Sequence, residues 1–161
     1  MSDKLEPMDL INILKSTKVV EPVLQGFPTL DPTDSIADAA EAMQSHRRGS
    51  TLVCRGNKLI GIFTERDWLK VVERDGDPTT PLAELMTTNP ETLTTDASLL
   101  DAIRLMDAGG YRRVPVVDKC QVPIGIVDVK TIVHFLVGHF PAAVYNQASH
   151  AQLITKNREG A

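Results

Sequence analysis

Two stretches of the chain, FPTLDPTDSIADAAEAM (Phe27–Met43) and PETLTTDASLLDAIRLM (Pro90–Met106), repeat one pattern at a constant spacing of 63 residues. In both stretches the apolar residues recur at the i, i+3, i+4, i+7 spacing that forms one face of an amphipathic helix. They are Ile36, Ala39, Ala40 and Met43 in the first copy and Leu99, Ala102, Ile103 and Met106 in the second. The spacing predicts two equivalent helices, each packed against a core.

Each predicted helix is preceded by the same start signal. Ser35 is followed three residues later by Asp38, and Ser98 by Asp101. The hydroxyl and the carboxylate of such a pair can satisfy N–H groups of the first turn that have no partner within the helix. The local chemistry therefore agrees with the periodicity.

After each helix, two apolar runs separated by a polar turn predict a β-hairpin. STLVC and LIGIF flank residues 55–58, and VPVV and VPIGIV flank residues 118–121. Further apolar helices are expected at residues 65–74 and 131–138, so the unit is strand, helix, strand, strand, helix. We expect an N-terminal extension (1–16) with a helix at Pro7–Lys15, repeats at 17–76 and 77–140 joined by the polar loop 73–80, and a polar tail (141–161).

Composition excludes several classes of protein. The 161 residues are 42% hydrophobic and 24% charged, which is typical of a soluble globular module. A net charge of −4 argues against nucleic-acid binding. The absence of a long apolar run and of a basic signal peptide predicts a cytoplasmic protein without a membrane span. Cys54 and Cys120 have no metal-ligand spacing, so no metal site is expected.

The two motifs GIFTERD (Gly61–Asp67) and YRRVPVVD (Tyr111–Asp118) resemble the cystathionine-β-synthase (CBS) domain family, whose pattern is Gly, apolar, x, Thr or Ser, x, x, Asp. The resemblance implies an α/β fold in which two tandem CBS repeats pack with pseudo-twofold symmetry, as a Bateman module. It also implies two clefts that can hold adenosine-containing ligands.

Thr64 and Asp67 have two interpretations. Thr-x-x-Asp after an apolar strand is a helix-capping box. A carboxylate in the first helical turn can also accept hydrogen bonds from the two hydroxyls of a ribose, each worth about 1.5 to 3 kcal/mol. The same helix N-terminus favours a phosphate beside Thr64. Both interpretations stay open for Thr64, and Asp67 is the main candidate for ribose binding.

The resemblance also implies that basic residues of the other repeat meet the phosphates. Arg112 and Arg113 occupy those positions, and because neighbouring residues of a strand point to opposite faces, Arg113 is favoured. Lys130 is a further candidate for phosphate. An apolar slot for adenine is expected near Thr29, Leu30 and Ile62.

The second copy departs from the motif. It has Asp128 where the first has Thr64, and Thr131 where the first has Asp67. Asp128 is a good helix cap, but its charge opposes a phosphate. Gly49 and Ser50 fall where the second copy has its two arginines, although Arg47 and Arg48 lie nearby. We expect one working nucleotide site in each chain.

No P-loop, nucleophile elbow or zinc-protease helix occurs, and the histidines have no catalytic partner at motif spacing, so no enzyme is predicted. We expect a regulatory module that senses AMP, ADP or ATP, with S-adenosylmethionine or cyclic di-AMP as further candidates. The alternative is a dimerising scaffold with vestigial clefts. A homodimer through the apolar residues 68–72 and 132–140 is implied by the resemblance, as is an unidentified regulated protein.

Overall fold

The computed structural model describes residues 7–23 and 26–139. The first helix, α1 (Pro7–Ser16), precedes two copies of the predicted unit. The expected tail at 141–161 and the first six residues of the expected extension lie outside the described residues. Within them, no helix is long and apolar enough to cross a membrane.

The predicted order of strands and helices is confirmed in both repeats. The first repeat contains β1 (Thr29–Leu30), α2 (Ile36–Ser45), β2 (Ser50–Arg55), β3 (Lys58–Thr64) and α3 (Glu65–Glu73). The second contains β5 (Leu93–Thr94), α5 (Leu99–Gly109), β6 (Arg113–Val117), β7 (Pro123–Asp128) and α6 (Val129–His139). Two short elements that follow α3, namely α4 (Leu82–Leu85) and β4 (Thr87–Thr88), were not expected from the sequence.

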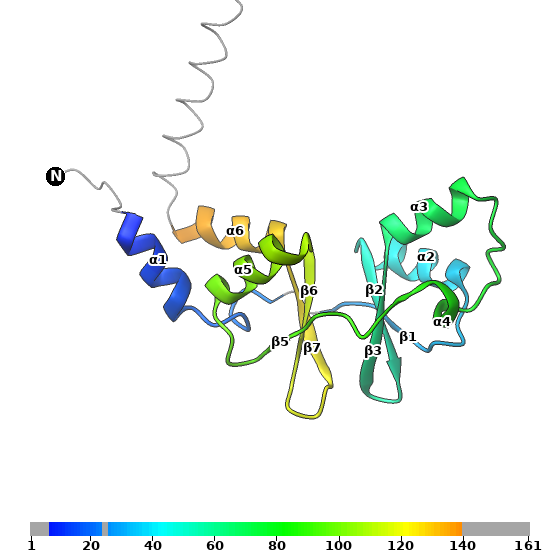
Figure 1. The fold of residues 1–161 in the computed structure, drawn as a ribbon, viewed down its shortest axis with the longest axis horizontal. Coiled ribbons are helices and arrows are strands. Elements are labelled where there is room, and N and C mark those ends of the chain that lie inside the picture. Colours follow the sequence, from blue (N-terminus) through cyan, green and yellow to red (C-terminus); the bar gives the residue numbers. More distant parts are fainter. Residues whose placement is uncertain (1–6, 24–25, 140–161) are drawn as a thin grey trace, which may run out of the picture.

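Each repeat forms its own small sheet. The strand order is β1-β2-β3-β4 in the first and β5-β6-β7 in the second. In both, the short first strand runs parallel to the next, which forms an antiparallel hairpin with its successor. Figure 1 shows the two hairpins side by side at the centre, with α2 and α3 beyond one and α5 and α6 beyond the other.

The capping boxes form as predicted. The Asp38 carboxylate accepts hydrogen bonds from the backbone N–H (2.8 Å) and hydroxyl (2.6 Å) of Ser35. Asp101 accepts the equivalent bonds from Ser98, at 2.9 and 2.7 Å. These bonds stabilise the charged form and hold the pKa of both carboxyls below the usual value, the serine hydroxyl contributing most.

The cores reveal an exchange of segments between the repeats. Val19, which precedes the first repeat's strands, is fully buried in the second repeat's core. Leu82, which follows the first repeat's helices, is fully buried in the first repeat's core. Backbone hydrogen bonds from Val19 N to Ala97 O (2.9 Å) and from Leu82 N to Asp34 O (2.8 Å) occupy equivalent places. Each core is thus completed by a segment that enters from beyond its own hairpin.

A third cluster joins the two sheets. Leu52 and Ile62 from the first hairpin pack with Ile126 from the second. At the turn end of the hairpins, Leu59 N donates a hydrogen bond to Gln121 O (3.0 Å). The two sheets therefore meet through apolar side chains and a backbone hydrogen bond between the hairpin turns, which helps to fix the position of helices α3 and α6 relative to one another.

Candidate functional site

The two helices that follow the hairpins begin at equivalent places. Thr64, at the end of β3, pairs with Ser50, and Asp128, at the end of β7, pairs with Arg113. The backbone N–H of Glu65 donates to Gly49 O at 3.1 Å, and that of Val129 donates to Arg112 O at 3.1 Å. The expected equivalence of Gly49 and Ser50 with the two arginines is confirmed.

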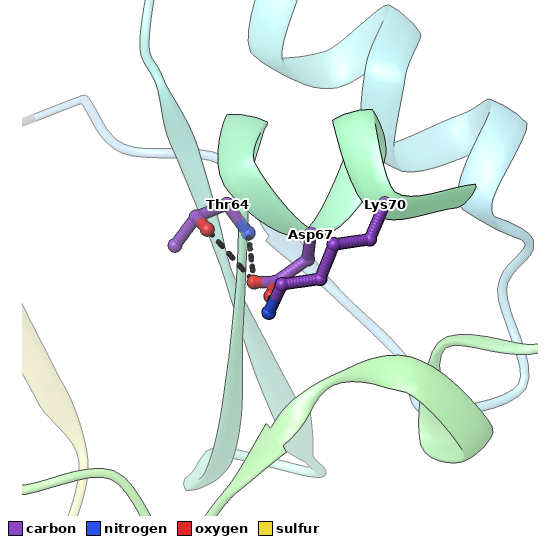
Figure 2. Close-up of polar contacts among 3 residues, drawn as sticks. All are labelled: Thr64, Asp67 and Lys70. Atoms are coloured by element: carbon purple, nitrogen blue, oxygen red, sulfur yellow. Dashed lines mark hydrogen bonds and ion pairs between the residues drawn. The ribbon is translucent and has the colours of Figure 1, made fainter. Parts of the chain in front are cut away.

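Asp67 caps the first turn of α3, as Figure 2 shows. Its Oδ2 accepts hydrogen bonds from the backbone N–H of Thr64 (3.0 Å) and from the Thr64 hydroxyl (2.7 Å). Its Oδ1 lies 3.3 Å from Lys70 Nζ, one turn later on the same helix. The capping interpretation of Thr64 and Asp67 is therefore confirmed. It does not exclude ribose binding, because a carboxylate oxygen can accept further hydrogen bonds.

Asp128 caps α6 with the Thr and Asp positions of the first repeat exchanged, so that the carboxylate comes first and the hydroxyl three residues later. Its Oδ1 accepts hydrogen bonds from the backbone N–H and the hydroxyl of Thr131, both at 2.6 Å. The predicted role of Asp128 as a helix cap is confirmed. Its carboxylate places a negative charge at the start of α6, where Thr64 places a neutral hydroxyl at the start of α3.

A cavity of about 1250 Å³ lies where the two repeats meet, and we call it the junction cavity. Of the described residues that line it, Arg47, Arg48, Arg113 and Lys130 are cationic, whereas Glu65 and Asp128 are anionic. The remaining lining residues are apolar, small, amide or imidazole side chains: Pro22, Phe27, Ala40, Met43, Gln44, Gly49, Ser50, Trp68, Ile126, Thr131, His134, Phe135, Gly138 and His139. A cavity with apolar walls and an excess of positive charge suits an anionic organic ligand.

The structure brings only part of the predicted site into this cavity. Arg113 and Lys130 line it. Asp67 is not among the lining residues, although Glu65 and Trp68, its neighbours in the first turn of α3, are. The other candidates are not among the lining residues. Arg112 and Thr29 are exposed, and the remaining three are Leu30, packed against the first core, Ile62, buried between the sheets, and the capping Thr64.

Several lining residues lacked a recognisable motif in the sequence. Trp68 packs against the first core and also lines the cavity. His134 and Phe135 reach the cavity from α6 of the opposite repeat. The contribution of α6 depends on how the repeats pack together, and no spacing within one repeat could have indicated it.

One ion pair crosses between the repeats at the cavity wall. Arg113 Nη2 lies 3.6 Å from Glu65 Oε2, with 30% of the arginine side chain and 65% of the glutamate side chain exposed. Gly49 leaves the space that this pair occupies, since a Cβ at that position would collide with Arg113 Nη2 and lie 2.6 Å from Glu65 Oε2. The pair therefore joins the start of α3 to the start of β6.

Among the described residues, no group of three or more His, Cys, Asp or Glu side chains is placed to hold a metal ion. The buried Cys54 and the exposed Cys120 are both free thiols.

Two α/β repeats of one design, joined through their sheets around a charged cavity, define a tandem-repeat module. A CBS domain sequence profile matches residues 17–74 and 82–138. The chain belongs to the CBS domain family.

Comparisons with individual proteins agree with this assignment. A CBS domain-containing protein of Arabidopsis thaliana is 36% identical over 105 residues, which cover 64% of this chain and 19% of the plant protein. This chain thus spans about a fifth of that relative's length.

Two solved structures share the fold. The CBS domain pair of protein MJ0100, in complex with 5′-methylthioadenosine and S-adenosyl-L-methionine, is 26% identical, with a TM-score of 0.69, and the match covers 74% of this chain and 99% of that one. The CBS domain protein PAE2072 of Pyrobaculum aerophilum, complexed with AMP, is 20% identical, with a TM-score of 0.68 over 71% of this chain and 88% of that one. Both are tandem CBS pairs in architecture.

Proposed function

We propose that this chain is a regulatory module that binds an adenosine-containing ligand between its two repeats. The observation that carries the proposal is the junction cavity, in which cationic side chains from both repeats face apolar walls. The MJ0100 pair, with 26% identity, holds two adenosine-containing compounds, which supports the same class of ligand here. AMP, ADP or ATP fits best because Arg113 and Lys130 can pair with phosphate.

Each part of the ligand has a proposed partner. The ribose hydroxyls bind Asp67, whose neighbours Glu65 and Trp68 line the cavity. The phosphates lie against Arg113 and Lys130, which belong to the opposite repeat. Arg112 is exposed and would contribute less. Adenine is proposed to occupy the apolar wall of the cavity, which includes Phe27 and Ile126. The residues expected from the sequence, Thr29, Leu30 and Ile62, are not among its lining residues.

A ligand held in this way contacts the starts of both α3 and α6. Binding then favours the packing of the repeats that best fits the ligand, and this shift is what a regulated protein would detect. The chain acts as a sensor without chemistry of its own. We expect one site in each chain, because the second repeat has Thr131 where the first has Asp67 and so lacks the carboxylate proposed to bind ribose.

The module also has a surface suited to a second copy of itself. Leu69 and Val72 on α3 and Val129 and Val133 on α6 have between 45% and 65% of their surface exposed, and we call this set the α3–α6 face. Exposed apolar side chains on the two equivalent helices favour a symmetric contact. A homodimer through the α3–α6 face belongs to the proposal. In the alternative function, as a scaffold, this face alone would matter.

A thermal-shift series separates the two functions. The protein is heated with saturating AMP, ADP, ATP, S-adenosylmethionine, NAD or cyclic di-AMP, and a ligand at 100 times its Kd should add about 2.7 kcal/mol to the stability. Calorimetric titration of the best ligand should then give one site per chain. If none of these compounds raises the melting temperature, the scaffold function is correct and the sensor is wrong. Two equivalent sites would contradict the proposed asymmetry of the clefts.

A further inference from the structure

Arg113, which is proposed to bind phosphate, forms an ion pair with Glu65. Arg113 Nη2 faces Glu65 Oε2 at 3.6 Å across the boundary between the repeats. Both side chains line the junction cavity. Since a carboxylate and a phosphate oxygen use the same guanidinium donors, the two compete for Arg113.

The backbone around the pair makes room for it. Glu65 is the first residue of α3, and its N–H is bonded to Gly49 O at 3.1 Å, so its Cα is held beside Gly49. A side chain at Gly49 would meet the outer atoms of both Arg113 and Glu65. In the second repeat, the residues at the places of Gly49 and Glu65 are Arg112 and Val129, which cannot form this pair. The arrangement occurs on one side of the module only.

We propose that Glu65 is a specificity-determining residue that competes internally with the ligand's phosphate for Arg113. The inference rests on the proposed function, and it predicts that the effect of Glu65 on affinity depends on the charge of the ligand. A phosphate must displace the Glu65 carboxylate from Arg113 and then lie close to its negative charge, which repels it. A neutral nucleoside leaves the ion pair intact. Glu65 thus weakens the binding of phosphorylated ligands relative to the binding of a neutral nucleoside.

The expected change in ligand affinity is large enough to measure. The pair is partly exposed, and such pairs typically change an equilibrium by about 1.4- to 5-fold. Loss of the competing charge should therefore tighten the binding of AMP by roughly threefold at low salt, and the gain should shrink as salt screens the charges.

The test uses three variants of the full chain. Glu65→Gln removes the charge, and Gly49→Ala pushes the pair apart while touching only the ends of two flexible side chains. Glu73→Gln removes the same charge from the exposed last residue of α3 and serves as the control. Calorimetry measures the affinities for AMP, adenosine and inorganic pyrophosphate, the last of which needs no nucleoside site.

We expect Glu65→Gln and Gly49→Ala to tighten AMP and pyrophosphate binding while adenosine binding and the Glu73→Gln variant stay unchanged. In an Arg113→Ala background the gain from Glu65→Gln should vanish. An unchanged or weaker affinity for AMP and pyrophosphate in Glu65→Gln overturns the inference, as does a gain that persists without Arg113.

The outcomes also separate this inference from the proposed function. If AMP binds the parent protein and Glu65→Gln binds it equally well, the inference fails and the function stands. If adenosine compounds do not bind but Glu65→Gln tightens pyrophosphate, the competition is real and the adenosine site is not. If none of the probes binds any variant, both are wrong.

Discussion

One carboxylate oxygen of Asp67, Oδ2, accepts both hydrogen bonds from Thr64, while the other, Oδ1, faces Lys70 Nζ at 3.3 Å. The cap therefore uses one side of the carboxylate. The other side meets the exposed Lys70, although only 14% of the Asp67 side chain is itself exposed. A ribose that binds Asp67 must replace this pair. Asp67 therefore has two separate roles, capping α3 and the proposed binding of ribose, and each can be measured on its own.

Asp67→Asn should weaken binding of the adenosine ligand by about tenfold or more, since the charged acceptor of the ribose hydroxyls is lost. The amide oxygen can still accept from Thr64, so the fold should persist. Calorimetry measures the affinity, and circular dichroism the melting temperature. The control is Glu73→Gln on the same helix. Unchanged ligand affinity in Asp67→Asn would show that the cap is the only role of this residue.

Arg113→Ala should reduce affinity for AMP by roughly tenfold and leave adenosine binding nearly unchanged, because the arginine meets only the phosphate. Arg112→Ala should cost less, as its side chain is exposed and is not among the lining residues of the cavity. Titrations with the two ligands give the comparison. Lys119→Ala, in the exposed turn of the second hairpin, controls for net charge. An equal loss for both ligands would contradict a phosphate contact.

The stability of α5 should depend on pH through its capping box. Hydrogen bonds from Ser98, the hydroxyl first, lower the pKa of Asp101 from 3.8 in the folded chain. A carboxyl with a lower pKa when folded adds stability above its unfolded pKa, and this is lost as the pH falls through the folded value. Ser98→Ala should therefore melt a few degrees lower at pH 7, for a loss of about 1 kcal/mol.

The difference between parent and Ser98→Ala should narrow as the pH falls through the lowered folded pKa of Asp101, because the carboxyl then becomes protonated in both proteins. Differential scanning calorimetry from pH 2 to pH 7 follows this trend. Asp107→Asn, on the exposed side of the same helix, should show no such pH dependence. A constant difference at every pH would mean that the Ser98 hydroxyl acts without the carboxylate.

The two thiols should differ in reactivity. Cys54 is 4% exposed, and its burial raises the pKa of its thiol, so little thiolate forms at pH 8. Cys120 lies exposed in the turn of the second hairpin. Iodoacetamide should add one group to the folded protein and two in denaturant, as read by mass spectrometry. Rapid modification of both thiols in the folded state would show that the first sheet opens.

Dimer formation should depend on the α3–α6 face. Leu69→Asp or Val133→Asp places a charge among exposed apolar side chains and should shift the protein to monomers in sedimentation velocity. Leu85→Asp is the control, because Leu85 is also exposed but lies on α4. A parent protein that is monomeric at all concentrations, or variants that remain dimeric, would refute this contact.

Local patterns explain what the sequence could predict. Apolar spacing indicated α2 and α5, and the hairpins followed from short apolar runs around polar turns, because each depends on neighbours in the chain. The first turn of α3 was recognised through Thr64 and Asp67. Such features can be predicted without knowing how the repeats pack.

The remaining features depend on distant contacts. The ion pair of Glu65 with Arg113 and the approach of His134 to the cavity arise only when the two sheets meet. Glu65 resembles any exposed charge at a helix start, so nothing in its sequence context marked it. Ile62 was expected near adenine, but its alternation along β3 places it in the apolar contact between the sheets.

The exchange of Val19 and Leu82 between the cores has a consequence for folding. A chain cut in the loop before α4 would leave its N-terminal half without Leu82 and its C-terminal half without Val19, each loss removing about 1.5 to 3 kcal/mol of burial. We therefore expect neither half to fold stably alone and the whole module to melt in a single cooperative transition. A ligand that stabilises one repeat should then also protect the other, because each core is completed by a segment from outside its own repeat.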